Sequence, residues 1–315
     1  MNSSNSLRRI AVLGSINMDL VARCAALPVP GQTLSGTSFT EIPGGKGANQ
    51  AVGASRAGAA VSMIGCLGDD GFATELSKNL IAEDINCSSV RNLADTASGV
   101  AMIVVSDSGE NQITVVPGAN AFVSRKDVDR NRLLIQNSDV LLLQLEVPLD
   151  TVLYAISNAR FLGTRVLLDP APAPLDAPDE LFDVDLICPN ITEAEAMTGQ
   201  KIQSIEGVEL AAQILAKRGA RAVAITMGDK GTALLDEQGF VVIDPFPTQA
   251  VDSTAAGDGF AGAVAVHWAE TGLLRDAIAR GNAAGSIAAS SHGAQPSMAT
   301  RAEIDQRLKQ ATQNT

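Results

Sequence analysis

The chain has 315 residues, 46% of them hydrophobic and 3% aromatic, which is enough for one large core built mainly from small side chains. Its formal net charge of −12, without any basic cluster, argues against a nucleic-acid or anionic-membrane surface. The four isolated cysteines and two histidines argue against a zinc site and fit reduced thiols. The chain starts with a short polar leader and has no apolar run near the roughly 18 residues of a membrane span, so we expect a soluble, cytoplasmic protein.

Strand-like apolar runs alternate with helix-like stretches along most of the chain. The predicted strands are Arg9 to Gly14, Val61 to Gly65, Val140 to Leu145, Arg165 to Asp169, Leu186 to Cys188 and Ala222 to Met227. The predicted helices are Ala48 to Ala57, Thr74 to Glu83, Leu149 to Phe161, Glu193 to Met197 and Val208 to Arg218, followed by a mostly helical segment from Phe260. This alternation of buried strands and helices predicts an α/β fold, a doubly wound and mainly parallel sheet flanked by helices.

Two regions break this alternation, because they contain β-type runs without intervening helices. They are Met18 to Ile42 and Ser98 to Pro117, and Gly109 to Asn111 lies inside the second like a hairpin turn. We interpret them as a small antiparallel sheet attached to the main sheet. We therefore expect a single domain, residues 1–315, with a β-sheet lid formed by about residues 16–42 and 98–117. Such a sheet can cover a site or pair two subunits.

Polar residues follow the first predicted strand, at the edge where open α/β sheets bind ligands. Asn17 and Asp19 alternate in an extended segment, so their side chains point to one face and can grip neighbouring hydroxyls. Capping of a helix or turn is the alternative. Further along, Pro43 to Gln50 contains three glycines that let the backbone approach a ligand, and Asn49 would lie near the first turn of the following helix. An asparagine suits a polyol because it both donates and accepts hydrogen bonds, but a plain turn is equally consistent.

Four more segments in the middle and late parts of the chain carry weaker signals. Glu146 closes an apolar strand, where sites are often built. Asn190 opens a helix with Glu193 three residues later, which fits either helix capping or a role near magnesium. Thr226 to Gly231 is typical of a strand followed by a glycine turn, and Gly293 to Ser297 is a loop whose carbonyls can coordinate a cation.

The most informative segment places Asp258 after a run of small residues and just before a helix-like stretch, Phe260 to Glu270. The backbone N–H groups of Ala255, Ala256 and Gly257 can converge there, and the following helix adds partial positive charge. Such a nest binds an anion such as phosphate. Asp258 can then take a proton from a nucleophile beside that anion, as general base catalysis requires. The segment therefore predicts phosphoryl transfer.

Rival phosphate motifs fit less well. The chain contains no Walker A sequence. Gly257 to Gly262 matches G-x-G-x-x-G, but helical segments rather than a βαβ unit follow it, and Asp276 lies inside a helical pattern instead of ending a second strand. A dinucleotide-dependent dehydrogenase is therefore disfavoured.

The order of these motifs resembles the ribokinase family of sugar kinases, the PfkB group, from about Arg9 to Ser297. The matching segments are Gly14 to Asp19, Gly44 to Gln50, Gln144 to Glu146, Asp169 to Ala173, Pro189 to Glu193, Asp252 to Asp258 and Gly293 to Ser297. The resemblance implies a ribokinase-like fold and ATP-dependent phosphorylation of the 5-hydroxyl of D-ribose. It also implies a β-sheet lid that forms the contact of a homodimer.

The resemblance assigns roles to single residues, with Asp258 as the general base. The residues that it implies for the sugar are Asn17, Asp19, Gly45, Lys46, Asn49, Glu146 and Asp258, and those for the anion hole are Ala255, Ala256 and Gly257. Those for ATP are Asn190, Thr226, Gly228, Gly231 and Asn282, with Asn190 and Glu193 also supporting Mg²⁺ through water. An activating monovalent cation, usually K⁺, matches Asp252, Thr254, Ala288, Ser291, Gly293 and Ser297, several of them through backbone carbonyls.

The chain departs from the family pattern at a few positions around the predicted base. Ser253 stands where Thr is usual, Gly259 replaces a Thr, Ala261 replaces an Asn, and Ser291 stands where a larger basic residue is common. These changes leave Asp258 intact but leave the exact substrate open. The alternatives are a kinase of deoxyribose, a nucleoside or a hexose, and a non-catalytic sugar sensor that keeps the pocket.

Overall fold

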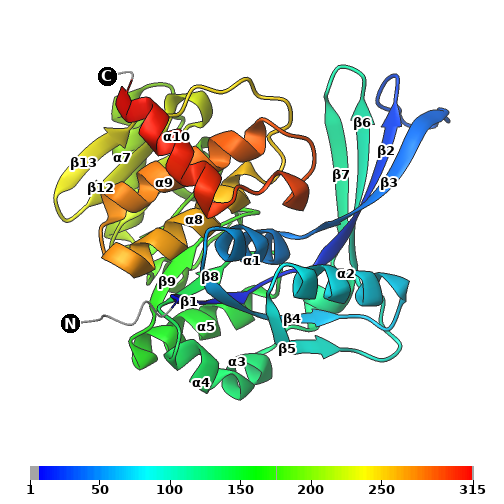
Figure 1. Cartoon of the computed structure of the whole chain (residues 1–315), viewed down its shortest axis with the longest axis horizontal. Helices are drawn as coiled ribbons and strands as arrows, with labels where there is room; N and C mark the ends of the chain where they lie inside the picture. The colour runs from blue at the N-terminus through cyan, green and yellow to red at the C-terminus, as the bar shows by residue number, and fades with distance from the viewer. Residues whose placement is uncertain (1–6, 175, 314–315) are drawn as a thin grey trace.

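A computed structural model describes residues 7–174 and 176–313, which form two sheets (Figure 1). The strands of the larger sheet are β1 (Arg9–Leu13), β4 (Ala60–Leu67), β5 (Asn86–Asn92), β8 (Val140–Leu143), β9 (Arg165–Leu168), β10 (Leu186–Ile187), β11 (Val223–Thr226), β12 (Thr232–Asp236) and β13 (Gly239–Ile243). Their order is β13-β12-β11-β10-β9-β8-β1-β4-β5. All neighbours pair in parallel except β11 with β12 and β12 with β13.

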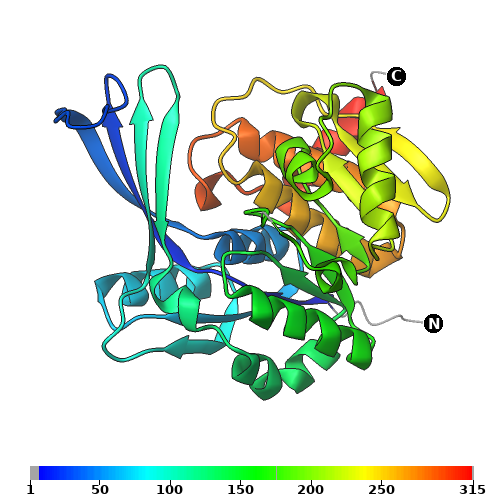
Figure 2. The same ribbon diagram turned by 180° about the vertical axis from the view of Figure 1, so that it is seen from behind.

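Helices cover both faces of this sheet. One face carries α1 (Lys46–Arg56), α2 (Gly71–Ala82), α8 (Ala256–Thr271), α9 (Leu274–Ala289) and α10 (Arg301–Gln313), as Figure 1 shows. The other face, seen from behind in Figure 2, carries α3 (Arg125–Arg130), α4 (Arg132–Gln136), α5 (Leu149–Leu162), α6 (Ile191–Thr198) and α7 (Ile205–Lys217). Successive side chains of β1 alternate between the two cores, as the pleat of a strand requires, with Ile10 on one face and Ala11 on the other. The predicted doubly wound fold is confirmed.

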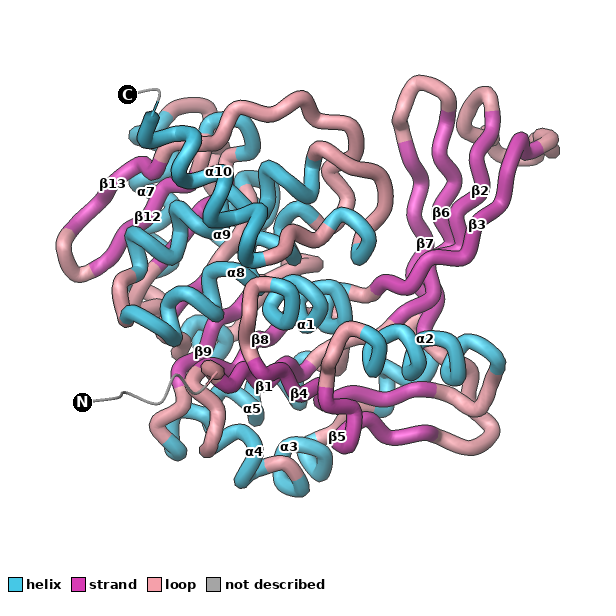
Figure 3. The backbone as a smooth tube through the Cα atoms, in the orientation of Figure 1, coloured by secondary structure: helices cyan, strands magenta, loops and turns pink. Residues whose placement is uncertain are grey.

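The smaller sheet consists of β2 (Asn17–Cys24), β3 (Gly36–Gly44), β6 (Gly99–Ser106) and β7 (Asn111–Val116), in the order β3-β2-β6-β7. It extends away from the helices in Figure 3. Its two outer pairings are antiparallel, and Gly109, with φ +85°, lies in the β6–β7 hairpin as expected. The central strands β2 and β6 run parallel, because both leave the same carboxyl edge of the larger sheet in the same direction.

A close crossing of α1 and α8 joins distant parts of the chain. A Cβ atom at Gly262 would lie 2.7 Å from the backbone nitrogen of Ala54, so only glycine permits this approach. The G-x-G-x-x-G match therefore serves helix packing, and it holds the start of α8 against α1. Among the described residues, no helix combines the length and apolar character needed to cross a membrane.

Candidate active site

Asp258 is buried, with 4% of its surface exposed, in the first turn of α8. The helix begins at Ala256 rather than at Phe260, so the prediction that Asp258 precedes the helix was wrong. The cause is Ala255, which adopts a left-handed conformation with φ 58° and turns the chain directly into the helix. The carboxylate therefore lies close to the positive end of the helix dipole.

The small residues before Asp258 line one wall of a cavity of 210 Å³. The amide of Ala256 already donates to the carbonyl of Ser253 at 3.2 Å. The Gly257 amide has no acceptor among the described residues, and a Cβ at Gly257 would meet no atom within 4 Å. Since the first N–H groups of a helix lack intrahelical acceptors, Gly257 presents an open donor to the cavity, next to Asp258.

Two amide side chains of α1 fix the orientation of the Asp258 carboxylate. Asn49 Nδ2 donates to Asp258 Oδ2 at 2.9 Å, and Gln50 Nε2 donates to Asp258 Oδ1 at 3.2 Å. Gln50 Nε2 also donates to Asp169 Oδ2 at 2.8 Å, while Gln50 Oε1 accepts from Gln144 Nε2 at 2.6 Å. The side chain of Gln50 thus bridges two buried carboxylates.

The residues that the resemblance assigned to the sugar come together around the start of β2 and of α1. Asn17 is held by Asn120, whose Nδ2 donates to Asn17 Oδ1 at 2.7 Å. Glu146 Oε2 accepts from Ser15 Oγ at 2.6 Å and from the Lys46 amide at 3.1 Å.

Asn49 keeps an acceptor free within this cluster. Its Oδ1 is buried and accepts no hydrogen bond within the part of the chain that the structure describes. A buried acceptor without a donor is costly, so the site favours a ligand that supplies a hydroxyl.

Gly45 is the residue that brings α1 against β2. It is the N-cap of α1 and has φ +87°, and a Cβ there would lie 2.7 Å from the backbone nitrogen of Asn17. Any other residue would be strained and would push the two elements apart.

Burial shifts the ionisation of the site carboxyls in one direction. It raises the pKa of Asp258, that of Asp169 to about 8 and that of Asp19 to about 7. Burial opposes the charge of Lys46, yet the carboxylates of Asp258, Asp169, Glu146 and Glu193 outweigh it and raise the pKa of its ammonium group. The site thus gathers several carboxylates around one lysine, an arrangement typical of functional sites.

The cavity beside Asp258 suits a hard cation carried in with phosphate. Asp169, Asn190 and Glu193 line it with oxygen donors, the ligand type that Mg²⁺ prefers. In residues 7–174 and 176–313, no group of three or more His, Cys, Asp or Glu side chains is arranged to hold a metal. A magnesium ion here would therefore take most of its ligands from phosphate and water, as this ion commonly does.

Four of the five predicted nucleotide residues lie after β10 or at the end of β11 and in the turn that follows it. Asn190 and Glu193 form the capping box of α6, in which the backbone amide of Asn190 donates to Glu193 Oε2 at 2.8 Å. Thr226 forms a parallel bridge with Asn190. Gly228 has φ +62° in the turn after β11, and Gly231 approaches the carbonyl of Ile243 so closely that a Cβ would lie 2.2 Å away.

The side chain of Asn282 is occupied inside the protein. It accepts from Thr232 Oγ1 at 2.6 Å and donates to the carbonyls of Ile243 and Asp244 at 3.1 and 3.0 Å. It therefore ties α9 to the β12–β13 hairpin.

The predicted cation residues lie at the end of α9 and in two loops that Asp252 joins. One of its carboxylate oxygens accepts from the Thr254 amide and the other from the Gly293 amide, both at 3.0 Å. The Ala288 carbonyl accepts from the Ser291 amide at 3.3 Å. Because the loop around Thr254 leads directly into α8, Asp252 links the second loop to the turn that carries Asp258.

Sequence reasoning did not assign roles to Ser15, Gln50, Asn120, Gln144 and Asp169. Gln50 and Asp169 lie in segments that matched the family, and Asp169 ends a predicted strand, so both carried a signal. Asn120 carried none, because it lies in a short helical turn 103 residues from Asn17.

Comparison with known proteins gives a consistent picture. A family model described as pfkB family carbohydrate kinase matches residues 7–301. The chain is 38% identical over 304 residues to the ribokinase of Haemophilus influenzae, covering 96% of this chain and 99% of that protein. It is 37% identical over 271 residues to the deoxyribokinase of Salmonella typhi, covering 85% and 88%. A solved structure of Arabidopsis thaliana ribokinase complexed with ribose and ATP superposes with a TM-score of 0.88 at 29% identity, covering 96% of this chain and 99% of that one.

Proposed function

The chain belongs to the pfkB family of carbohydrate kinases, and we propose that it transfers the γ-phosphoryl group of ATP to the 5-hydroxyl of D-ribose. The observation that carries this proposal is the buried carboxylate of Asp258, oriented by Asn49 and Gln50 beside the open amide of Gly257. A base and an anion site in one cavity are what in-line phosphoryl transfer requires.

In this mechanism, Asp258 accepts the proton of the ribose 5-hydroxyl while the oxygen of that hydroxyl forms a bond to the γ-phosphorus of ATP. The bond from that phosphorus to the bridging oxygen breaks, and ADP leaves with the electron pair. The amides of Ala255, Ala256 and Gly257 stabilise the charge on the transferring group. The Ala256 amide must exchange its weak bond to Ser253 for this role. Asn190 and Glu193 would hold Mg²⁺ through water, and the ion would supply further charge neutralisation on the phosphates.

We propose that the sugar lies between β2 and α1. Asn17, Asp19, Asn49 and Glu146 offer hydrogen-bonding groups to its hydroxyls, with Gly45 and Lys46 beside them. The smaller sheet then closes over the sugar as a lid of the same domain. We propose that ATP lies along Asn190, Thr226, Gly228 and Gly231, with Asn282 supporting that wall.

A second candidate substrate is 2-deoxyribose, because the deoxyribokinase of Salmonella typhi is as similar to this chain as the ribokinases are. A coupled ADP-release assay with ribose, deoxyribose, fructose and adenosine separates the candidates. We expect the highest kcat/KM for ribose. A higher value for deoxyribose would replace the assignment, and ribose binding without turnover would point to a sugar sensor.

We propose a K⁺ site formed by Asp252, Thr254, Ala288, Ser291, Gly293 and Ser297. Backbone carbonyls suit K⁺, and the site lies behind the turn that carries Asp258, so the ion shapes that turn without touching substrate. Asp252→Ala removes the link between the two loops and should abolish most of the K⁺ stimulation in the ADP-release assay. Equal wild-type rates in K⁺ and in a large organic cation would contradict the site.

We also propose a cytoplasmic homodimer that pairs through the smaller sheet. The four cysteines are free thiols, which fits a reducing compartment. Large apolar side chains of the smaller sheet are 45 to 61% exposed, which fits an interface; they are Phe39, Met102, Ile113, Val115 and Val116. Sedimentation of the wild type and of Met102→Asp measures the assembly, and a monomeric wild type would contradict it.

A further inference from the structure

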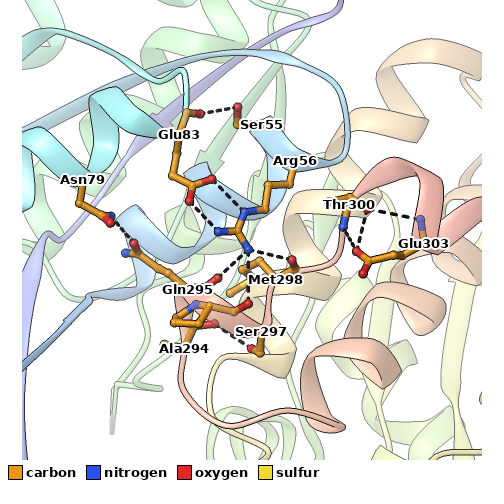
Figure 4. Close-up of polar contacts among 11 residues, drawn as sticks. Ser55, Arg56, Asn79, Glu83, Ala294, Gln295, Ser297, Met298, Thr300 and Glu303 are labelled. Carbon is orange, nitrogen blue, oxygen red and sulfur yellow. Dashed lines mark hydrogen bonds and ion pairs between the residues drawn. The ribbon is translucent and has the colours of Figure 1, made fainter. Parts of the chain in front are cut away.

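Arg56, the last residue of α1, binds the loop that contains Gly293 and Ser297 (Figure 4). Its Nη1 donates to the carbonyl oxygens of Gln295 at 2.9 Å and Met298 at 3.0 Å, with Pro296 at 3.5 Å. Its other two nitrogens form a fork on Glu83, with Nε to Oε2 at 2.8 Å and Nη2 to Oε1 at 2.6 Å. A bidentate guanidinium–carboxylate pair fixes the plane of the arginine, so Glu83 aims Nη1 at the loop.

The carbonyl groups of residues 293–298 divide into a set that accepts hydrogen bonds from side chains and a set that does not. Those of Gln295, Pro296 and Met298 face Arg56, and that of Ala294 accepts from Ser297 Oγ at 2.8 Å. In the part of the chain that the structure describes, no donor reaches the carbonyls of Gly293 and Ser297. These two carbonyls belong to the proposed K⁺ ligands, so the protein satisfies the other carbonyls of the loop and leaves these two for the ion.

The same loop is held from two further sides. Asn79 Nδ2, from α2, donates to Gln295 Oε1 at 2.6 Å, as Figure 4 shows. The Met298 side chain packs at the crossing of α1 and α8, where its Sδ lies 3.2 Å from the position of a Cβ on Gly259. The residue before Gly259 is the proposed base, so a displaced loop would also disturb the packing under Asp258.

We propose that Arg56, aimed by Glu83, is a positioning residue that presets the carbonyls of Gly293 and Ser297 for the monovalent cation. The inference rests on the proposed K⁺ site. Without Arg56, three carbonyls lose their common donor, and the loop must be ordered when the ion binds. Residues that orient the ligands of a metal commonly change affinity by roughly 10–100-fold, although they do not touch the ion.

The test measures activity against K⁺ concentration for the wild type, Arg56→Met and Arg56→Lys at saturating ribose and ATP. We expect the half-saturating K⁺ concentration to rise about tenfold or more in Arg56→Met, with a smaller change of kcat at saturating K⁺. Arg56→Lys keeps the charge but has no planar group that can bind both Glu83 and the loop. Its half-saturating K⁺ concentration should therefore lie between those of the wild type and Arg56→Met.

Arg91 provides the matched control. It forms the same kind of fork on Asp127, with distances of 2.5 and 2.9 Å, and its Nη2 also donates to the carbonyl of Phe122 at 2.9 Å. Arg91→Met therefore removes the same kind of fork, with one carbonyl bond instead of three, away from the loop. We expect it to lower the melting temperature without changing the half-saturating K⁺ concentration.

Three outcomes separate the inference from its premise. A higher half-saturating K⁺ concentration in Arg56→Met alone supports the inference. An equal shift in Arg56→Met and Arg91→Met, or a lower kcat at unchanged K⁺ dependence, overturns the role of Arg56 while the K⁺ site stands. A wild type that is indifferent to K⁺ overturns the site itself and the inference with it. Hydrogen exchange of residues 293–298 adds a readout independent of activity, and unchanged protection in Arg56→Met would also overturn the inference.

Discussion

Both edges of the nine-stranded sheet carry charged residues. At the amino edge these residues are paired within the protein, and at the carboxyl edge carboxylates outnumber the cations. At the amino edge, a cavity of 600 Å³ is lined by four arginines, larger than the 210 Å³ cavity beside Asp258. Its arginines are already bound within the protein: Arg160 pairs with Asp183 at 2.9 Å, Arg221 with Asp185 at 2.8 Å and Arg275 with Asp236 at 3.3 Å, and Arg165 donates to the Trp268 carbonyl at 3.1 Å.

At the carboxyl edge, the balance of charge is different. Asp19, Asp169 and Asp258 are buried and Glu193 is half-buried, all four have raised pKa values, and Lys46 is the cation in their midst. Burying carboxylates without enough partners lowers stability, and a ligand that brings hydroxyl donors or cations relieves it. Charge pairing therefore favours the carboxyl edge as the candidate site, whereas the size of the cavity would favour the amino edge.

The strongest test of this contrast removes the proposed base. Asp258→Asn keeps the size of the side chain and one of its two acceptor oxygens but cannot take the proton, so kcat should fall at least about 100-fold. Asp185→Asn is the control at the amino edge, and its kcat should stay within about twofold of the wild type. Steady-state ADP release at saturating ribose measures both, and near-normal turnover of Asp258→Asn would remove it from the mechanism.

The next test disturbs the crossing that supports the site. A Cβ at Gly262 would overlap Ala54, so Gly262→Ala should lower the free energy of unfolding by roughly 1–3 kcal/mol, as overpacking commonly does. It should also lower kcat, because α1 carries Asn49 and Gln50. Gly71→Ala, where a Cβ meets no atom within 4 Å, should change neither quantity. Denaturant unfolding compares them, and equal stability of the two variants would contradict the tight crossing.

The sheet could be predicted from the sequence because buried parallel strands are continuous apolar runs, as β8 shows with Val140 to Leu143. Strands β5 and β13, which are partly exposed, were missed, and so was β12, although its first three residues are buried. The short helices α3 and α4 were missed as well. The sequences of these two helices have mixed polarity. Contacts with neighbouring elements, rather than a local pattern, determine their structure.

The candidate site could be proposed from the sequence where acidic and amide residues follow strand ends, as Asp19 and Glu146 do. The partners that hold these residues depend on tertiary contact, and Asn120 and Gln144 have no local pattern that reveals it. The start of α8 was misplaced because Ala255 adopts the left-handed conformation. This conformation is rare for residues other than glycine, and no sequence pattern signals it here.

The pH dependence of ribose binding tests the buried carboxylates at the carboxyl edge, and we expect about a tenfold change in affinity. The pKa of Asp19 is raised to about 7 by burial, so the ribose-free protein holds a proton there below that pH and loses it above. Its unfolded pKa is near 3.8, so between roughly pH 4 and 7 the native state binds the extra proton, and this contribution to stability falls as pH rises.

In the proposed sugar site, ribose hydroxyls donate to the ionised carboxylate of Asp19, so ribose affinity should increase about tenfold from pH 6 to 8 in the wild type. Asp19→Asn should bind more weakly and with a flatter pH dependence. Calorimetric titration across this range measures the affinity. An equally steep dependence in the variant would assign the titration to another group, such as Asp169.

The smallest expected effect is at the amino edge, and it tests the other half of the contrast. Arg221 is 64% exposed and its partner Asp185 also accepts from the Val166 amide at 2.9 Å, so Asp185 keeps a donor when the arginine is replaced. Exposed ion pairs contribute about 1 kcal/mol or less, so Arg221→Gln should change the free energy of unfolding by no more than that and leave kcat/KM unchanged. Denaturant unfolding and the ADP-release assay measure both. If Arg221→Gln lost about tenfold or more in kcat/KM with its stability intact, the larger cavity would serve the reaction, and charge pairing would no longer tell the two edges apart.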